Sequence, residues 1–563
     1  MSDNSRRRLF AIYIALALIG GLIVAQLIRL QVIEQADWVK LRTRIITRTT
    51  TLSAPRGRIW DRSGNLVADN VTRFQVMADP RNVNINKAVE KLAPVLNIPP
   101  GELRVKLADQ DKQALLATRL PLLTGEAVRK LDLWAVYSTP YWQRAYPERQ
   151  LLSHVLGFVN AEGRGYYGVE GQYDSLLHGR DQIVQAKQDA FAQPSPFDLK
   201  NAQEPKPGVD LVLTVDRTFQ ALAEAELSRA LSETGAKSGT LVAMDPRTGA
   251  VLSMASLPAF DPNDYLDTPR ERFVNPAVSD SFEPGSTFKI LTMAAALQEG
   301  RVTPETTYND TACTEVGGVT MCNWDRRAHG ISTMVDLLAQ SLNVGAAQVA
   351  KKLGGQAFYR DIQAFGIGRP TGIDLQGEAG GSLRVPGDLD WHESDLGTHS
   401  FGQGLSATPI QLISAVSAIA NDGIQMRPYV VAQKMDGKQI LTANPAQLGR
   451  PVSAQTARTL TTMLEQALDR ESSPARVPGY RIAGKTGTAQ IPIAGGYDDP
   501  WTIASFIGWG PVSDPKLIIL IKLDRPTSSP WGSQTAAPVF SRLALRMFVL
   551  LGVPPDNVRA STR

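Results

Sequence analysis

The sequence predicts an α/β fold in which an antiparallel sheet is flanked by helices, preceded by an elongated α+β pedestal and one N-terminal transmembrane helix. Three observations lead to this prediction. Strand-like segments lie at both ends of the region after residue 206, with helical sequence between them; a polar, proline-bearing stretch at 182–207 precedes that region; and an apolar run fills residues 9–28. Strands around a helical middle are typical of layered sheets and helices. We therefore expect four parts: a cytoplasmic tail (1–8), a transmembrane helix (9–29), a pedestal (30–205) and an α/β domain (206–555).

The apolar run at 9–28 contains one amide, Gln26, and no charge. About 20 apolar residues are needed for a helix to cross a bilayer. A cleaved signal peptide, with a shorter core and a small-residue cleavage site, is one alternative, and a buried soluble helix is another. Because Arg6 to Arg8 precede the run, we expect a cytoplasmic N-terminus and an extracytoplasmic remainder. No second run of this length is present, so the chain is expected to cross the membrane once.

The composition is that of an ordinary globular protein. Of the 563 residues, 20% are charged and 43% are hydrophobic, which argues against disorder. A net charge of +4 is small for this length and does not suggest a nucleic-acid partner. The five histidines are scattered, and two cysteines cannot form a four-cysteine zinc site. The sequence therefore predicts no metal site.

The two cysteines suggest a β-hairpin linked by a disulfide. Cys313 and Cys322 flank a segment with Gly317-Gly318 at its centre and β-prone residues on each side, which favours a hairpin. In an oxidising compartment the two cysteines would form a disulfide across the strands. Two ordinary free thiols are the alternative.

The pedestal sequence favours short elements. Residues 31–52 are expected to be helical and then extended, and 54–66 form a turn-rich stretch. Short helices are expected at 86–96, 101–117 and 125–132.

In the α/β domain, hydrophobic periodicity predicts strands around a helical middle. Strands are expected at 209–215, 239–245, 250–256, 481–490, 502–510 and 517–524. A helix is expected at 219–231, a helical middle from about 286 to 420, and a closing helix from Pro538 onward.

A first motif is the run Ser286-Thr287-Phe288-Lys289. The breaker Glu283-Pro284-Gly285 precedes it and good helical sequence follows at 290–298, so the serine should lie in the first turn of a buried helix. Residues three apart share one helix face, and a buried, neutral lysine amine can take the proton of a serine hydroxyl. The pattern alone is weak, because Ser513-Asp514-Pro515-Lys516 also matches it; there Pro515 and the flanking strands indicate a turn.

A second motif, Ser341-Leu342-Asn343, follows helical sequence at 333–340. Its hydroxyl could relay a proton and its amide could hold a substrate carbonyl. A helix-connecting turn with capping residues is the simpler interpretation. The matching runs Ser2-Asp3-Asn4 and Ser63-Gly64-Asn65 are expected to be a cytoplasmic segment and a turn.

A third motif, Lys485-Thr486-Gly487-Thr488, lies on the strand expected at 481–490. A lysine and hydroxyls on one strand could bind a carboxylate, and Gly487 leaves room for a substrate backbone. An edge strand with a solvated lysine is the alternative.

The three motifs are far more informative together. Their first residues are 55 and 144 positions apart, and each falls on the element it needs: a helix start, a loop and a strand. In this order they resemble the motifs of penicillin-binding proteins and serine β-lactamases. The resemblance to class B penicillin-binding proteins covers nearly the whole chain, since four further segments are similar to that family's N-terminal motifs: 56–64, 144–147, 154–160 and 168–174. In the family these segments are structural, and the fold is the penicillin-binding transpeptidase fold.

The resemblance implies roles for five catalytic residues. Ser286 would be the acylated nucleophile and Lys289 its general base. Ser341 and Asn343 would shuttle protons and hold the donor peptide, and Lys485 would act with them.

The resemblance also implies how substrate is bound. Lys485, Thr486 and Thr488 would bind the terminal carboxylate of the stem peptide or of a penicillin, with Gly487 admitting the substrate backbone. The backbone N–H groups of Ser286 and Thr488 would form the oxyanion hole. No cofactor or metal is needed.

The implied function is peptidoglycan D,D-transpeptidation, inhibited by β-lactams. Segments 154–160 and 168–174 are more similar to the division-type, FtsI-like branch than to the elongation-type branch. Expected partners are peptidoglycan stem peptides on lipid-linked glycan strands, a SEDS-family (FtsW/RodA-like) glycosyltransferase and other divisome proteins. We expect neither a glycosyltransferase domain nor C-terminal PASTA repeats. The alternatives are a β-lactamase, a D,D-carboxypeptidase and a non-catalytic scaffold or β-lactam sensor.

Overall fold

The computed structural model describes residues 3–38, 47–108, 113–187, 203–493 and 495–561. Its contacts divide the chain into two units that interleave along the sequence. Unit 1 comprises Met1–Pro55, Val71–Gln143 and Gly179–Pro207, and unit 2 comprises Arg56–Asn70, Arg144–His178 and Gly208–Arg563. Ser2 and most of the proline-bearing stretch predicted as a domain boundary, 188–202, lie outside the described residues.

The N-terminal apolar run forms helix α1 (Asp3–Ile28), which continues as a π-helical turn, η1 (Arg29–Ile33). Within the described ranges, Arg6–Ile33 is the one helix long and apolar enough to cross a membrane. Its mean hydropathy is 2.4 and none of it is buried. A core helix of a soluble protein would be buried by its neighbours, so the exposure of α1 argues against that alternative.

In unit 1, helices α3 (Ile85–Leu96) and α4 (Pro100–Lys106) share an apolar core with strands β3 (Leu66–Ala78) and β4 (Ala114–Leu120). The helix expected at 101–117 is therefore wrong at 114–117, because β4 pairs antiparallel with β3. Residues 109–112 of that expected helix lie outside the described residues. Unit 1 also contains β1 (Thr47–Leu52), which pairs with β8 (Gln182–Lys187), together with α5 (Leu122–Lys130) and most of β5 (Val136–Ala145).

Unit 2 contains the predicted antiparallel sheet, in the order β11-β10-β22-β21-β20. The strands are β10 (Ser238–Met244), β11 (Val251–Leu257), β20 (Ala483–Ile493), β21 (Gly496–Gly510) and β22 (Leu517–Asp524). All neighbouring strands run antiparallel, as the sequence predicts. The strand expected at 209–215 is β9 (Asp210–Leu213); it belongs to a different sheet, where it pairs with β17 (Val431–Asp436) and β2 (Ile59–Trp60).

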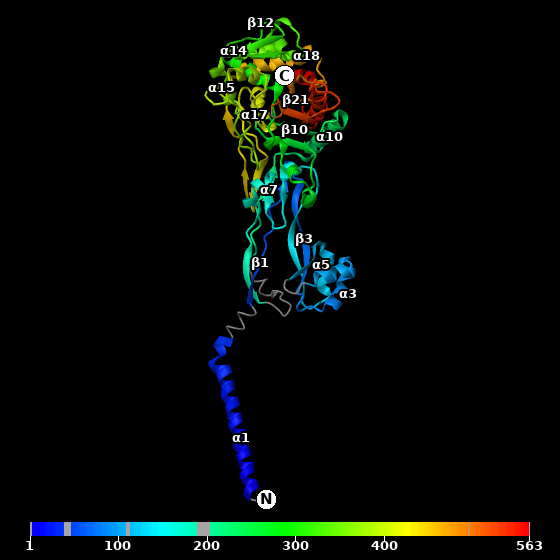
Figure 1. Ribbon diagram of the computed structural model, residues 1–563, viewed down its shortest axis with the longest axis vertical. Helices are drawn as coiled ribbons and strands as arrows, with labels where there is room; N and C mark the ends of the chain where they lie inside the picture. Colours follow the sequence, from blue (N-terminus) through cyan, green and yellow to red (C-terminus); the bar gives the residue numbers. More distant parts are fainter. Residues whose placement is uncertain (1–2, 39–46, 109–112, 188–202, 494, 562–563) are drawn as a thin grey trace. The chain divides into compact units, whose positions relative to one another are not determined.

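Both faces of this sheet are covered by helices, which explains why β10, β11 and β22 are almost continuously buried. Side chains alternate between two cores: Leu241 and Ala243 of β10 pack toward α10 (Arg217–Thr234) and α19 (Ala536–Leu550), whereas Val242 and Met244 face the opposite core. That second core contains the fully buried helix α17 (Pro409–Ala420) and α12 (Lys289–Gln298). The layers can be followed in Figure 1 from green (β10) to red (α19).

A buried ion cluster joins the early segments of unit 2. Glu170 is fully buried and lies 2.7 Å from Arg56 Nε and 2.6 Å from Arg144 Nε. Burial raises the pKa of Glu170, but the two guanidinium groups outweigh it and leave the pKa below its usual value. Segments 56–64, 144–147 and 168–174 are thus structural, as the family resemblance implies. Removing one member would leave a buried charge without its partner.

Candidate active site

Ser286 lies in a 3-10 turn, η4 (Gly285–Phe288), and Lys289 begins the α-helix α12. The sequence predicts an α-helical first turn here. In a 3-10 turn, residues i and i+3 eclipse one another, and Lys289 Nζ accordingly lies 3.0 Å from Ser286 Oγ. Gly285 has a φ of +55°, and a Cβ there would lie 2.9 Å from the carbonyl oxygen of Thr488, so only glycine fits this sharp entry to the turn.

Lys289 is buried, with 1% of its surface exposed. Its Nζ donates to the carbonyl oxygen of Ser341 at 2.7 Å and to Asn343 Oδ1 at 2.8 Å. Burial, and then the positive charge of Lys485, hold its pKa well below the usual value. A neutral amine has two N–H groups and one lone pair. The two acceptors can engage both N–H groups, which leaves the lone pair for the hydroxyl of Ser286.

The second motif connects α13 (Met334–Ala339) to α14 (Asn343–Leu353). Ser341 adopts a φ of +59°, an uncommon conformation for a residue with a side chain. Its Oγ accepts from Lys485 Nζ at 3.1 Å and lies 3.3 Å from Lys289 Nζ. The Ser341 hydroxyl therefore bridges the two lysines, an arrangement that a capping turn would not require.

The third motif lies on β20, at the edge of the five-stranded sheet. Lys485 is only 3% exposed, so it is not a solvated edge residue. Burial lowers its pKa to about 8, while the Glu471 carboxylate acts in the opposite direction. At Gly487, a Cβ would lie 2.4 Å from Ser505 Oγ and 2.9 Å from the Thr287 methyl carbon, so a side chain there would push β20 away from η4.

The three motifs line a single cavity of about 520 Å³. Ser286, Lys485, Thr486 and Thr488 are among the residues predicted from the sequence that line it. Sequence analysis missed several others, which lie in loops or at helix ends: Trp324, His329, Gln340, Gln403, Glu471, Trp531 and Gln534. Trp324 and Trp531 meet edge to face at 5.1 Å and are 56% and 37% exposed. These residues belong to no recognisable sequence motif, because only the fold brings them together.

The other sequence runs that match the Ser-x-x-Lys and Ser-x-Asn patterns lie outside the site. Ser513 to Lys516 form the turn between β21 and β22, where Lys516 Nζ pairs with Asp514 at 2.8 Å. Ser63 lies in a turn after β2 and donates to Asp216 Oδ2 at 2.8 Å. Neither run lines the cavity.

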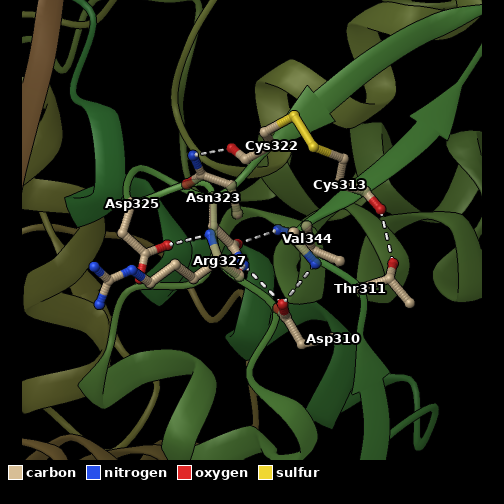
Figure 2. Close-up of a disulfide and its surroundings, with 10 residues drawn as sticks. Asp310, Thr311, Cys313, Cys322, Asn323, Asp325, Arg327 and Val344 are labelled. Carbon is tan, nitrogen blue, oxygen red and sulfur yellow. Dashed lines mark hydrogen bonds between the residues drawn. A yellow bond between two sulfur atoms is a disulfide. The ribbon is translucent and has the colours of Figure 1, made fainter.

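The predicted hairpin and disulfide are confirmed beside the site (Figure 2). Strands β13 (Cys313–Val316) and β14 (Val319–Cys322) pair antiparallel, with Cys313 directly opposite Cys322. The carbonyl oxygen of Cys322 accepts a hydrogen bond from Asn343 Nδ2 at 3.1 Å. The hairpin therefore contacts the second motif directly.

Comparisons with known proteins agree with this geometry. The model for the penicillin binding protein transpeptidase domain matches residues 239–545, and that for the penicillin-binding protein dimerisation domain matches 51–213. The chain is 35% identical over 520 residues to Stage V sporulation protein D of Bacillus subtilis, covering 90% of this chain and 80% of that protein. It is 30% identical over 573 residues to the Pseudomonas aeruginosa protein named "Probable peptidoglycan D,D-transpeptidase PbpC", covering 100% and 98%. The crystal structure of penicillin binding protein 3 from Mycobacterium tuberculosis, complexed with aztreonam, is similar with a TM-score of 0.70 and 27% identity, covering 90% of this chain and 98% of that one.

Proposed function

This chain belongs to the class B penicillin-binding proteins, which carry dimerisation and transpeptidase domains, and on that premise we propose that it cross-links peptidoglycan through an acyl-enzyme at Ser286. The protein is a D,D-transpeptidase. One observation supports the assignment of the nucleophile above all others: the buried amine of Lys289, with its lowered pKa, lies 3.0 Å from Ser286 Oγ.

In the proposed acylation, Ser286 Oγ attacks the carbonyl carbon of the D-Ala-D-Ala bond while Lys289 Nζ takes the hydroxyl proton. The backbone N–H groups of Ser286 and Thr488 stabilise the oxyanion that forms. The proton then moves through Ser341, whose hydroxyl lies between the two lysines, to the departing D-Ala amine. The amine of a second stem peptide next attacks the ester, which forms the cross-link and releases Ser286.

Substrate binding rests on β20 in this proposal. Lys485, Thr486 and Thr488 hold the terminal carboxylate of the stem peptide, and Gly487 lets its backbone approach the strand. A β-lactam carboxylate would occupy the same position. Asn343 holds the donor peptide and also accepts an N–H of Lys289.

The full-length protein in detergent, incubated with polymerised lipid-linked glycan, is expected to release D-Ala and form cross-linked peptide dimers. Penicillin should stop both, because the antibiotic occupies Ser286. Mass spectrometry of the digested product provides the measurement. D-Ala release with only shortened, uncrosslinked peptides would identify a carboxypeptidase, and rapid hydrolysis of penicillin without a lasting adduct would identify a β-lactamase.

We further propose that the enzyme acts at the division septum as a single-pass membrane protein with its N-terminus in the cytoplasm. Three arginines, Arg6 to Arg8, lie at the start of the helix and precede its apolar run, which supports that orientation. The pedestal (30–205) and α1 would contact a SEDS-family glycosyltransferase and other divisome proteins, and residues 206–555 would carry out transpeptidation. Similarity of 154–160 and 168–174 to the division-type branch supports this role.

Depletion of the protein in growing cells is expected to produce filaments that elongate without septa, because lateral wall synthesis would continue. Phase-contrast microscopy, with a fluorescent fusion scored for mid-cell position, measures the effect. Rounded, swollen cells with the fusion along the lateral wall would instead assign the protein to elongation.

A further inference from the structure

The side-chain amide of Asn343 is fixed from both ends. Its Oδ1 accepts from Lys289 Nζ at 2.8 Å, and its Nδ2 donates to the carbonyl oxygen of Cys322 at 3.1 Å. If the amide turned over, an N–H would point at the N–H of Lys289 and an oxygen at the carbonyl of Cys322. The position of the Cys322 carbonyl thus decides which end of Asn343 faces the lysine.

The next residue, Asn323, connects this point to the start of α14. It is 2% exposed, and its Oδ1 accepts from the backbone N–H of Val344 at 3.1 Å (Figure 2). Its backbone N–H donates to the carbonyl oxygen of Ala312 at 2.9 Å. A single side chain therefore ties the end of the hairpin to the first turn of the helix that carries Asn343.

Asn323 is itself held by Asp310, a carboxylate that is 1% exposed. Asp310 Oδ1 accepts from Asn323 Nδ2 at 2.7 Å and also from the backbone N–H groups of Ala312 and His329 at 3.2 and 3.3 Å. Asn323 Nδ2 also donates to the carbonyl oxygen of Arg327 at 3.2 Å. Both N–H groups of the Asn323 amide are thereby used, so its Oδ1 must face Val344.

We propose that Asn323 is a positioning residue for transpeptidation, and that the Asp310–Asn323 pair sets the orientation of Asn343 and, through it, of the amine of Lys289. The contacts run from Asp310 to Asn323, to the neighbouring Cys322 carbonyl and Val344 amide, to Asn343, and then to Lys289. Asn323 does not touch substrate in this scheme. The proposal rests on the proposed role of Lys289 as the base that activates Ser286.

The test exchanges the side chains of Asp310 and Asn323. The rate of acylation of the full-length protein by a fluorescent penicillin is measured by stopped flow. Asn323→Asp keeps the acceptor for Val344 but places a second carboxylate against Asp310. Adding Asp310→Asn restores a donor and an acceptor between the two positions. Asn309→Asp is the matched control, because it makes the same change on an exposed side chain of β12 (Thr307–Asp310).

The readout separates positioning from folding. The amplitude of labelling reports the folded fraction, the concentration dependence reports penicillin binding, and the rate constant at saturation reports the acylation step itself. In Asn323→Asp the saturating rate constant is expected to fall about 10- to 100-fold, with binding little changed, because a small misplacement of a catalytic group costs this much. The exchanged double variant should recover part of the loss, and Asn309→Asp should match the wild type.

An unchanged saturating rate constant in Asn323→Asp, with only amplitude or melting temperature lowered, would overturn the proposal and leave Asn323 a structural residue. If Asn323→Asp does not fold, the double variant Asn323→Asp/Asp310→Asn is compared with the single variant Asp310→Asn. A slow single variant together with a double variant as fast as the wild type supports the proposal. If both variants acylate as fast as the wild type, the proposal is overturned. A wild type that is not acylated at all would instead refute the proposed function.

Discussion

Replacing Ser286 by alanine is expected to abolish acylation by penicillin and peptide cross-linking together. In the proposed mechanism the side chain removed is the nucleophile of both reactions, and loss of an enzyme's nucleophile lowers turnover by about 10⁴-fold or more. The measurement is the covalent labelling of full-length protein by a fluorescent penicillin, resolved by gel electrophoresis. Since Ser286 is only partly buried, the alanine variant should unfold at the temperature of the wild type.

Ser513→Ala is the matched control, because Ser513 begins the other Ser-x-x-Lys run of the chain. It should be labelled like the wild type. Labelling that persists in Ser286→Ala and disappears in Ser513→Ala would move the nucleophile to the β21–β22 turn and contradict the mechanism.

Replacing Lys289 by methionine is expected to lower the acylation rate by about 10²- to 10⁴-fold, the usual contribution of a general base. Methionine keeps much of the buried apolar stem but removes the amine. The wild-type rate should also depend on pH. Burial and the charge of Lys485 hold the pKa of Lys289 well below its usual value. The rate should therefore fall as the pH falls through that lowered pKa, because the protonated amine cannot accept the serine proton.

The acylation rate measured across pH, for wild type and variant, checks both expectations. In Lys289→Met the residual rate should lose this pH dependence. Lys516→Met, which changes the lysine of the Ser513–Lys516 run, should leave both the acylation rate and its pH dependence unchanged. A Lys289→Met enzyme with wild-type rate and profile would assign the base to another group.

Local pattern and spacing were sufficient to predict the sheet, its antiparallel order and the three motifs. Strands β11 and β22 are mostly apolar, and the buried residues of α10 recur with helical spacing, so these elements could be recognised from the sequence. The motif residues could be found because each needs a particular side chain on a particular element. The stretch at 114–117 was misassigned because its apolar residues fit helix and strand equally, and only pairing with β3 decides between them.

Other parts of the site could not be predicted from the sequence. The acceptor that orients Asn343 is the backbone carbonyl of Cys322. Every residue has such a carbonyl, so the identity of residue 322 does not predict this contact. Asn323 and Asp310 are ordinary polar residues until the hairpin and α14 are packed together. Trp324 and Trp531 lie more than 200 residues apart in the chain and meet only in the folded protein.

The interleaving of unit 2 has a consequence for the biogenesis of the enzyme. Residues 56–70 lie early in the chain, yet β2 pairs with β9, which begins at Asp210, and β9 pairs with β17, which begins at Val431. The sheet that contains β2 therefore cannot be completed before β17 has been synthesised, and such long-range closure is slow. A truncation that starts after residue 208 would lose β2, Arg56 and Glu170 and expose one edge of β9, so we expect it to be less stable than the full-length protein.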